Sequence, residues 1–326
     1  MVHSSVFFKL FPPPKFLTMP HAGLEISDDA LRCISYSMTT HGLVISKCAR
    51  LELPFGLIEG GDIKNEKQFT DILSSFTRTH KLSYVKVSLP EEKVYLFQVD
   101  IPNTNVHVIE QQVEFKLEEN VPLSPSEAVF YFDILPASVT GGALRASVSV
   151  LSKTYVEGFT KALHTLGMTP LAFEIAAKSI ARTAIPAGSE DTEMILHVMN
   201  RKTGIYIVCS GVVCFSSTIA WGSRSDDISK SPTDLNIGQL VKEVDRVHDY
   251  WTTRPHAPSA IAKIVVVGRD APVIHTALSS PAIDRLPPIS VADVWRNAFD
   301  VNTYIPPISR DESFEYGVAA GLALLM

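Results

Sequence analysis

The residues of this chain that could do chemistry are its cysteines, histidines, serines and carboxylates, and their spacing argues against most of that chemistry. The four cysteines are Cys33, Cys48, Cys209 and Cys214. No two of them have Cys-x-x-Cys spacing, and none is accompanied by a second pair of Cys or His. A zinc site therefore has little support. If residues 39–42 form a hairpin turn, Cys33 and Cys48 could lie opposite each other, and we expect buried, reduced thiols there.

The histidines, serines and acidic pairs also lack a catalytic arrangement. His248 and His256 have no second ligand pair at metal-binding spacing, so we interpret them as surface or packed side chains. Ser210-Gly211 and Gly222-Ser223 lack the Gly-x-Ser-x-Gly frame of a nucleophile elbow. Three acidic pairs are interpreted as solvated loop charges: Asp28-Asp29, Glu91-Glu92 and Asp226-Asp227. The sequence therefore predicts no catalytic residue and no metal site.

The composition is that of a globular protein with no affinity for nucleic acid. Of the 326 residues, 46% are hydrophobic and 20% are charged, whereas disorder needs fewer apolar and more charged residues. The net charge is −6 and the sequence has no basic stripe, which argues against a nucleic-acid partner. The apolar stretch 204–221 is interrupted by serines and is interpreted as two paired strands, not as a membrane span.

Residues 1–20 are predicted to form an N-terminal tail. The segment is rich in phenylalanine and lysine, and three prolines at 12–14 interrupt it, so no signal peptide is predicted. Two interpretations remain open for the tail. It folds onto its own domain, or it contacts a membrane surface or a partner protein.

Residues 108–135 show the clearest pattern of secondary structure. Apolar side chains recur there near helical spacing, with glutamates on the opposite side: Val108, Ile109, Val113, Phe115, Leu117 and Val121. Pro122 and Pro125 end the predicted helix, because proline lacks an amide donor and disfavours helical angles in the residue before it. Val129 and Tyr131 then lie in a predicted strand. The block is therefore one helix and one strand of a small α/β unit.

The rest of the chain predicts two successive modules that each begin with three strands. Strands are predicted at 23–26, 32–38, 43–53, 84–88, 94–101, 145–151, 171–174, 194–199, 204–209, 212–220 and 264–267, and helices at 66–80, 155–166, 176–184, 240–251, 272–278 and 314–326. The short, breaker-rich segment 186–189 separates the modules. Such a duplication indicates a two-lobed α/β fold.

Several segments, taken in order, resemble the type IV pilus assembly protein PilM family, whose members are actin-like relatives of the division protein FtsA. The matching segments are 11–15 (FPPPK), 23–27 (GLEIS), 58–64 (IEGGDIK), 87–93 (VSLPEEK), the block 108–135 and 316–322 (YGVAAGL). Each segment alone is a weak motif. Their common order, over essentially the whole chain from about residue 7, is the basis of the resemblance.

The resemblance implies an α/β, actin-like fold of two lobes around a nucleotide cleft, with a small α/β subdomain inserted in the first lobe. The implied division is a tail at 1–20, a first lobe at 21–89, an insert at 90–169 and a second lobe at 188–307. Residues 170–187 and 308–326 return to the first lobe. The block 108–135 lies inside the insert.

The resemblance also implies a nucleotide site made by two facing hairpins, and the chain departs from the family pattern in both. The family's Asp-Ile-Gly is Glu25-Ile26-Ser27 here, and serine does not adopt glycine's backbone angles cheaply. The family's Asp-x-Gly aligns with His197-Val198-Met199, where a neutral imidazole is a poor Mg²⁺ ligand. Arg201 and Lys202, in the following turn, are interpreted as an ordinary solvated turn.

The third nucleotide motif of the family, a strand ending in Gly-Gly for the adenosine, reads Gly268-Arg269 in this chain. The implied positions of the site are Glu25, Ser27, His197, Thr203, Gly204, Gly222, Gly268 and Arg269. ATP and Mg²⁺ are the cofactors that the resemblance implies. Because all three motifs are altered, we expect weakened or lost ATP binding and lean towards a protein that is not an enzyme.

The leading functional hypothesis is a PilM-like cytoplasmic scaffold at the inner face of the cell membrane. The resemblance implies that it binds the cytoplasmic tail of a PilN-like inner-membrane protein, together with other pilus assembly proteins. We expect the insert to bind this tail, near Glu114, Glu118, Asn120, Val121 and Pro122.

Two alternatives remain open. One is a functional ATP-binding protein of the same fold, whose nucleotide state tunes partner binding. The other is an FtsA-like, filament-forming membrane cytoskeleton protein that associates with itself. FtsA attaches to membranes through a C-terminal amphipathic helix, whereas residues 317–326 are apolar on all sides, which favours burial.

Overall fold

The computed structural model of the chain describes residues 20–40, 42–102, 106–135, 143–223, 237–254, 259–280 and 285–324. Predictions made for the N-terminal tail, for the acidic pair at 226–227 and for the last two residues therefore lie outside the described residues. Within the described part, no helix is both long enough and apolar enough to cross a membrane.

The first of two five-stranded sheets has the strand order β10-β6-β1-β2-β3. β1 pairs antiparallel with β2, and β2 with β3, whereas β6 and β10 run parallel to β1. The strands are β1 (Ala22–Ile26), β2 (Ala30–Thr39), β3 (Gly42–Glu52), β6 (Tyr84–Leu89) and β10 (Thr169–Ile175). We call this sheet and the helices on it the first lobe.

The second five-stranded sheet repeats the topology of the first. Its order is β13-β12-β11-β14-β15, in which β11 to β13 form an antiparallel meander and β14 and β15 run parallel to β11. The strands are β11 (Thr192–Val198), β12 (Thr203–Cys209), β13 (Val212–Ile219), β14 (Ile261–Gly268) and β15 (Ile289–Val291). This second lobe confirms the duplication predicted from the sequence, although the short strand β15 was not predicted.

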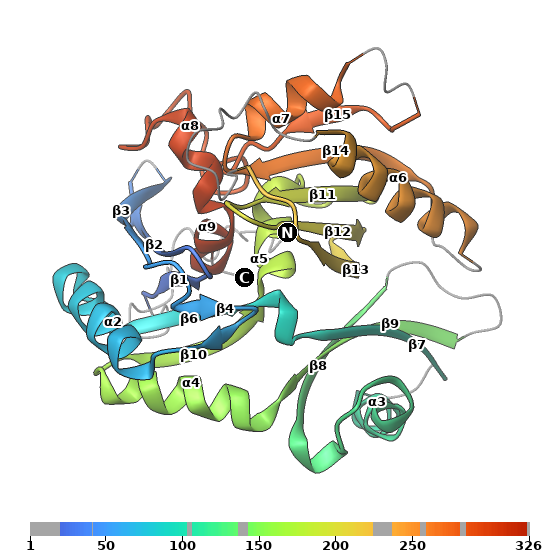
Figure 1. Ribbon diagram of the computed structural model, residues 1–326, viewed down its shortest axis with the longest axis horizontal. Helices are drawn as coiled ribbons and strands as arrows, with labels where there is room; N and C mark the ends of the chain where they lie inside the picture. Colours follow the sequence, from blue (N-terminus) through green and yellow to red (C-terminus); the bar gives the residue numbers. More distant parts are fainter. Residues whose placement is uncertain are drawn as a thin grey trace.

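Two buried helices, α5 (Ala176–Ala184) and α9 (Gly317–Ala323), lie between the two sheets, as Figure 1 shows. α9 packs against α5 and β1 so closely that a side chain at Gly23 would clash with the backbone of Ala319. The outer faces of the sheets are covered by further helices: α2 (Glu66–His80) and α4 (Lys153–Thr165) on the first, and α6 (Ile237–Thr253) and α7 (Ala271–Leu278) on the second. The largest core therefore runs between the lobes.

Local sequence explains where α2 begins and ends. The Asn65 side chain accepts a hydrogen bond from the amide of Gln68 and so caps the first turn, while Lys81 takes the left-handed conformation after the last one. Phe69, Leu73 and Phe76 recur at helical spacing and are buried. These signals are local, and the helix predicted at 66–80 is confirmed at both ends.

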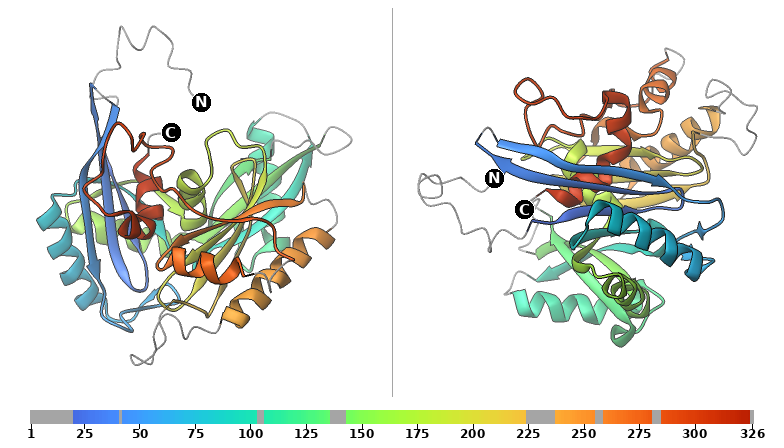
Figure 2. Two further views of the ribbon diagram at one scale, coloured as in Figure 1. Left: turned by 90° about the horizontal axis from the view of Figure 1, so that it is seen from above. Right: turned by 90° about the vertical axis from the view of Figure 1, so that its left-hand side faces the viewer.

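A three-stranded antiparallel sheet with one helix forms a separate unit beside the lobes. Its order is β7-β9-β8, from β7 (Tyr95–Pro102), β9 (Ala143–Ser152) and β8 (Ala128–Ile134), and α3 (Val106–Asn120) packs on one face. Figures 1 and 2 show α3 at the outer surface of this unit, away from α5 and α9. We call the unit the insert. The residue limits proposed for the insert and lobes stay predictions.

The structure corrects three expectations. Phe115 was placed on the apolar face of α3 but is 72% exposed, because it lies on the side of the helix opposite Val113. The β2–β3 register places Cys33 opposite Ala49 and Cys48 opposite Ile34, so the two thiols lie on opposite faces of the sheet. All four cysteines are free.

The third correction concerns the C-terminal helix predicted at 314–326. The chain there forms a helical turn, α8 (Arg310–Ser313), a 3-10 turn, η4 (Phe314–Tyr316), and then the short α9. A capping box between Ser309 and Glu312 starts this region earlier than the sequence pattern indicated. Every residue of α9 is buried, which confirms the expectation of burial.

Candidate functional site: the cleft between the lobes

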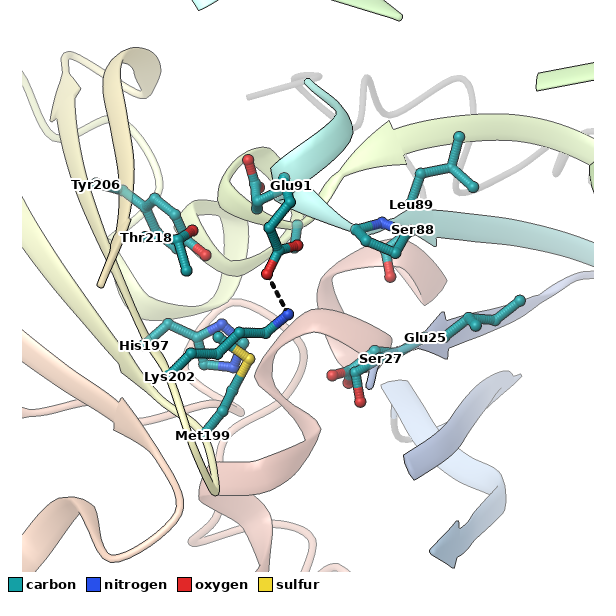
Figure 3. A pocket seen from close by; sticks show the side chains of 14 residues that line it. Glu25, Ser27, Ser88, Leu89, Glu91, His197, Met199, Lys202, Tyr206 and Thr218 are labelled. Atoms are coloured by element: carbon teal, nitrogen blue, oxygen red, sulfur yellow. Dashed lines mark hydrogen bonds and ion pairs between the residues drawn. The ribbon is translucent and has the colours of Figure 1, made fainter. Parts of the chain in front are cut away.

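The β1–β2 turn of the first lobe and the β11–β12 turn of the second lobe face each other across a cleft. Lys202, in the second of these turns, donates to Asp28 in the first, with 2.9 Å between Nζ and Oδ2. The same ammonium forms an ion pair with Glu92, drawn as the dashed line in Figure 3. Burial lowers the pKa of Lys202, but Glu92 and Asp28 outweigh it and raise the pKa, so the ammonium is charged. The two turns are therefore bonded to each other directly.

The first hairpin directs its polar atoms to neighbours in the chain. Glu25 is only 3% exposed and accepts from Arg32, with 3.1 Å between Nη1 and Oε1. Burial raises the pKa of Glu25 to about 7, against the opposing effect of Arg32. The Ser27 hydroxyl donates to Asp29 at 2.6 Å and caps its own turn. Glu25 and Ser27 both line the cleft, but the Glu25 carboxylate is already paired with an arginine.

The second hairpin is closed by apolar and neutral side chains. His197 is buried, and that burial lowers its pKa to about 3, so the imidazole is neutral. The Tyr206 ring lies 6.4 Å from the imidazole, and a side chain at Gly204 would collide with the Tyr206 hydroxyl at 2.1 Å. Thr203 donates to the carbonyl of Trp221 at 2.8 Å. His197, Thr203 and Gly204 therefore all make their contacts within the second lobe.

Two glycines of the implied site, Gly222 and Gly268, have close backbone contacts that explain why these positions lack a side chain. Gly268 has a φ of +97°, and a side chain there would lie 2.2 Å from the carbonyl oxygen of Val198. A side chain at Gly222 would lie 2.3 Å from the backbone of the β11–β12 turn. Both glycines are therefore required by packing alone. Arg269, which follows, forms an ion pair with Glu315 at 3.3 Å.

The space left in the cleft is small. The cavity there has a volume of about 30 Å³ and is lined by the side chains labelled in Figure 3, among them Glu25, Met199 and Tyr206. Such a volume holds one or two water molecules, whereas ligand pockets commonly measure about 300–1,000 Å³. Among the described residues, no group of three or more His, Cys, Asp or Glu could hold a metal ion. The residues present do not fit ATP with Mg²⁺.

Several residues of the cleft were interpreted wrongly from the sequence. Asp28 and Glu92 were expected to be solvated, yet both bind Lys202, and Glu91 is half-buried and accepts two hydrogen bonds. The turn that carries Arg201 and Lys202 was also expected to be solvated. Arg201 is exposed, as expected, and its guanidinium lies 3.4 Å from the exposed Phe55 ring of the first lobe, whereas Lys202 is largely shielded between two carboxylates. The one feature of the sequence that could have indicated these ion pairs is the presence of opposite charges in turns of the two modules. The sequence alone does not show that these turns lie close together.

Glu91 joins three parts of the molecule. It lies in the turn η1 (Glu91–Lys93), accepts from the amide of Ala177 at the start of α5 at 2.6 Å and from Ser216 of the second lobe at 3.2 Å. An acidic side chain at a helix N-terminus is stabilised by the unpaired amides there. Burial nevertheless raises the pKa of Glu91 to about 7.

The predicted partner-binding residues lie at the C-terminal end of α3 and just beyond it. Glu114, Glu118, Asn120 and Pro122 are exposed, whereas Val121 is 5% exposed and belongs to the core of the insert. The unpredicted Phe115 lies beside the two glutamates on the solvent side of the helix. The structure thus brings an aromatic ring and two carboxylates onto one exposed helix face.

Two lobes of the same topology, facing hairpins and an inserted α/β unit define an actin-like fold. Solved structures with this fold support the assignment. The structure is similar to that of a chain in the "PilM-PilN type IV pilus biogenesis complex", with a TM-score of 0.74 and 16% sequence identity. The match covers 94% of this chain and 98% of the other. The ethanolamine utilization protein EutJ from Carboxydothermus hydrogenoformans gives 0.53 at 9% identity, covering 96% and 90%.

The family follows from the sequence itself. The family model described as "Type IV pilus assembly protein PilM" matches residues 23–225, which is more than half of the chain. The chain therefore belongs to the PilM family of type IV pilus assembly proteins. No curated protein sequence matches the chain.

Proposed function

We propose that this protein is a scaffold of a type IV pilus assembly complex that acts at the inner face of the cell membrane. In this proposal the insert binds the cytoplasmic tail of a PilN-like inner-membrane protein, and binding does not depend on ATP. One contrast carries the proposal. The cleft is filled by the chain's own side chains, whereas the outer face of α3 exposes Phe115 beside Glu114 and Glu118.

The charge of that face fits a membrane-protein tail. Cytoplasmic segments next to membrane spans carry an excess of lysine and arginine. The glutamates of α3 offer complementary charge, which speeds association and sets orientation, while Phe115 offers an aromatic anchor of the kind that dominates binding energy. Family membership and the fold shared with the PilM-PilN complex support the same partner class.

The partner test is binding of a peptide with the sequence of the cytoplasmic tail of a PilN-like inner-membrane protein. Exchange of both Glu114 and Glu118 for lysine is expected to weaken binding at least roughly tenfold, because it reverses the charge of the face. A matched control exchanges Glu66 and Glu157, two exposed glutamates on α2 and α4, for lysine. Isothermal titration at low and moderate salt measures both. Equal affinity of wild type and the α3 variant would overturn the assignment of this face.

The nucleotide test is direct. A fluorescent ATP analogue with Mg²⁺ is expected to show no saturable binding, because the cavity holds only one or two waters and Lys202 already has two carboxylate partners. Saturable binding that is lost in Glu25→Gln would instead favour the ATP-binding alternative.

A further inference from the structure

The contacts between the two lobes concentrate at the place where the facing hairpins meet. Lys202 reaches from the second lobe to Asp28 and Glu92 of the first, and its side chain is only 16% exposed. A cation that is largely shielded from water and flanked by two carboxylates is held more firmly than a surface ion pair. Arg201, from the same turn, stacks on the ring of Phe55 in the first lobe.

A second group of charges, around Glu315, also joins the lobes. The Glu315 carboxylate is shared by Arg32 at 3.1 Å and Arg50 at 3.0 Å, both from the first lobe, and by Arg269 at 3.3 Å, from the second. Arg269 also lies 3.9 Å from Glu52, at the end of β3. Glu315 lies in η4, which contacts β2 and β14, so this cluster bridges strands of both sheets.

Lys202 and Arg269 come from the turns that follow β11 and β14. Each therefore projects from the end of a strand of the second sheet towards the first lobe. In two-lobed folds of this kind, a bound ligand commonly provides the contacts that close the domains. In this chain, the side chains of Lys202, Arg201 and Arg269 make contacts of this kind across the cleft.

We propose that Lys202 and Arg269 form an internal latch that holds the two lobes closed in place of a ligand. The two lobes are then closed against each other without any ligand. The insert keeps one fixed orientation relative to both lobes when a partner binds it. This deepens the proposed function, since it assigns the regulation of the scaffold: the closed state is set by the chain's own charges and does not respond to nucleotide. Lys202 lies between two carboxylates. Removal of its ammonium would leave the negative charges of Asp28 and Glu92 close together without a cation, and this repulsion opposes loss of the latch.

The test uses the chain alone, without partner, so a failed latch and a failed partner assignment are distinguishable. Lys202→Glu places a third carboxylate against Asp28 and Glu92 and is expected to open the cleft. Hydrogen exchange of the amides at 27–30 and 91–93 should become about tenfold faster. Small-angle scattering should show a larger radius of gyration than the wild type has. Addition of ATP with Mg²⁺ should leave the wild-type exchange pattern unchanged.

Three further variants keep the test decisive. Lys67→Glu makes the same charge change on an exposed position of α2 and should behave as wild type. Combining Lys202→Glu with Glu92→Lys returns a cation to the site and should restore slow exchange. If Lys202→Glu does not fold, Lys202→Met, which keeps the apolar stem, should still give faster exchange at the same amides. Wild-type exchange and scattering in Lys202→Met or Lys202→Glu, or slower exchange of the wild type with ATP, would overturn the latch.

Discussion

At the scale of single residues, two carboxylates of the cleft, the buried Glu25 and the half-buried Glu91, have raised pKa values. Glu25 and Glu91 both lie in low-dielectric surroundings, and burial raises the pKa of each to about 7. Their partners differ, since Glu25 accepts from a guanidinium and Glu91 from a helix amide and a hydroxyl. Protonation of Glu25 would weaken an ion pair with Arg32, whereas protonation of Glu91 breaks no ion pair of this kind. Glu91 is therefore the better position for testing how burial of a carboxylate affects stability.

Replacement of Glu91 by glutamine should change how stability depends on pH. Between its ordinary pKa of 4.5 and about 7, the folded protein holds a proton on Glu91 that the unfolded chain has released. The contribution of Glu91 to the free energy of unfolding therefore falls as pH rises through that window. Glutamine has no such proton, so Glu91→Gln should gain stability relative to wild type as pH rises from about 5 to about 7, by roughly 3 kcal/mol at most.

Urea unfolding at the two ends of that pH range measures this difference. Glu157→Gln, on the exposed side of α4, serves as the control and should follow the wild-type profile. A constant difference between Glu91→Gln and wild type across the range would show that Glu91 is ionised in the folded protein.

At the scale of elements, the two faces of α3 have different roles. One face packs in the core of the insert, and the other is exposed and is the face that we propose binds a partner. Ile109, Val113 and Leu117 recur every four residues and fill the core of the insert against its sheet. Phe115 and the glutamates lie on the other face, where they contribute to surface chemistry and not to the core. A partner is thus free to bind one face without disturbing the other.

Two alanine substitutions in α3 should therefore differ strongly. Leu117→Ala creates a cavity in a fully buried position and should lower the free energy of unfolding by about 2–5 kcal/mol. Phe115→Ala removes an exposed ring and should change it by no more than about 0.5 kcal/mol, while weakening tail binding. Far-ultraviolet circular dichroism in urea measures the first effect and titration of the tail the second. Equal destabilisation by both would contradict the exposed position of Phe115.

At the scale of the whole molecule, the insert is attached to the second lobe as well as to the first. Gln98 of β7 and Ser147 of β9 are directly opposite each other and donate to two consecutive carbonyls of β13, those of Cys214 at 3.0 Å and Val213 at 2.5 Å. β13 is the edge strand of its sheet, and these two side chains donate to its backbone. The insert therefore helps to fix the lobes relative to each other.

Loss of this attachment should loosen β13 locally. Gln98→Ala removes one donor to a part-buried carbonyl and should cost about 1 kcal/mol, seen as several-fold faster hydrogen exchange in β13. Thr154→Ala, at an exposed position of α4, is the control. If amides of β13 exchange at the wild-type rate in Gln98→Ala, the Gln98 hydrogen bond contributes nothing to holding the second lobe.

Much of the fold could be predicted, because its signals are local. The helix at 66–80 was predicted at both ends from its periodicity, and the prolines after α3 marked its end. The exposed Phe115 was missed although the four-residue spacing of its buried neighbours excluded it. The short β15 was missed because three residues carry too little pattern, and it is defined by its pairing with β14.

The sequence by itself determined the elements, the duplication of the two modules and the family, since periodicity, breakers and motif order are all written locally along the chain. Only the tertiary structure decided what the cleft contains. Lys202 meets Asp28 across 174 positions and Glu92 across 110, and Arg269 meets Glu315 across the same cleft. Whether such charges are solvated, bind an anion or bind each other depends on the distance between two lobes, and that distance is set by packing of the whole core.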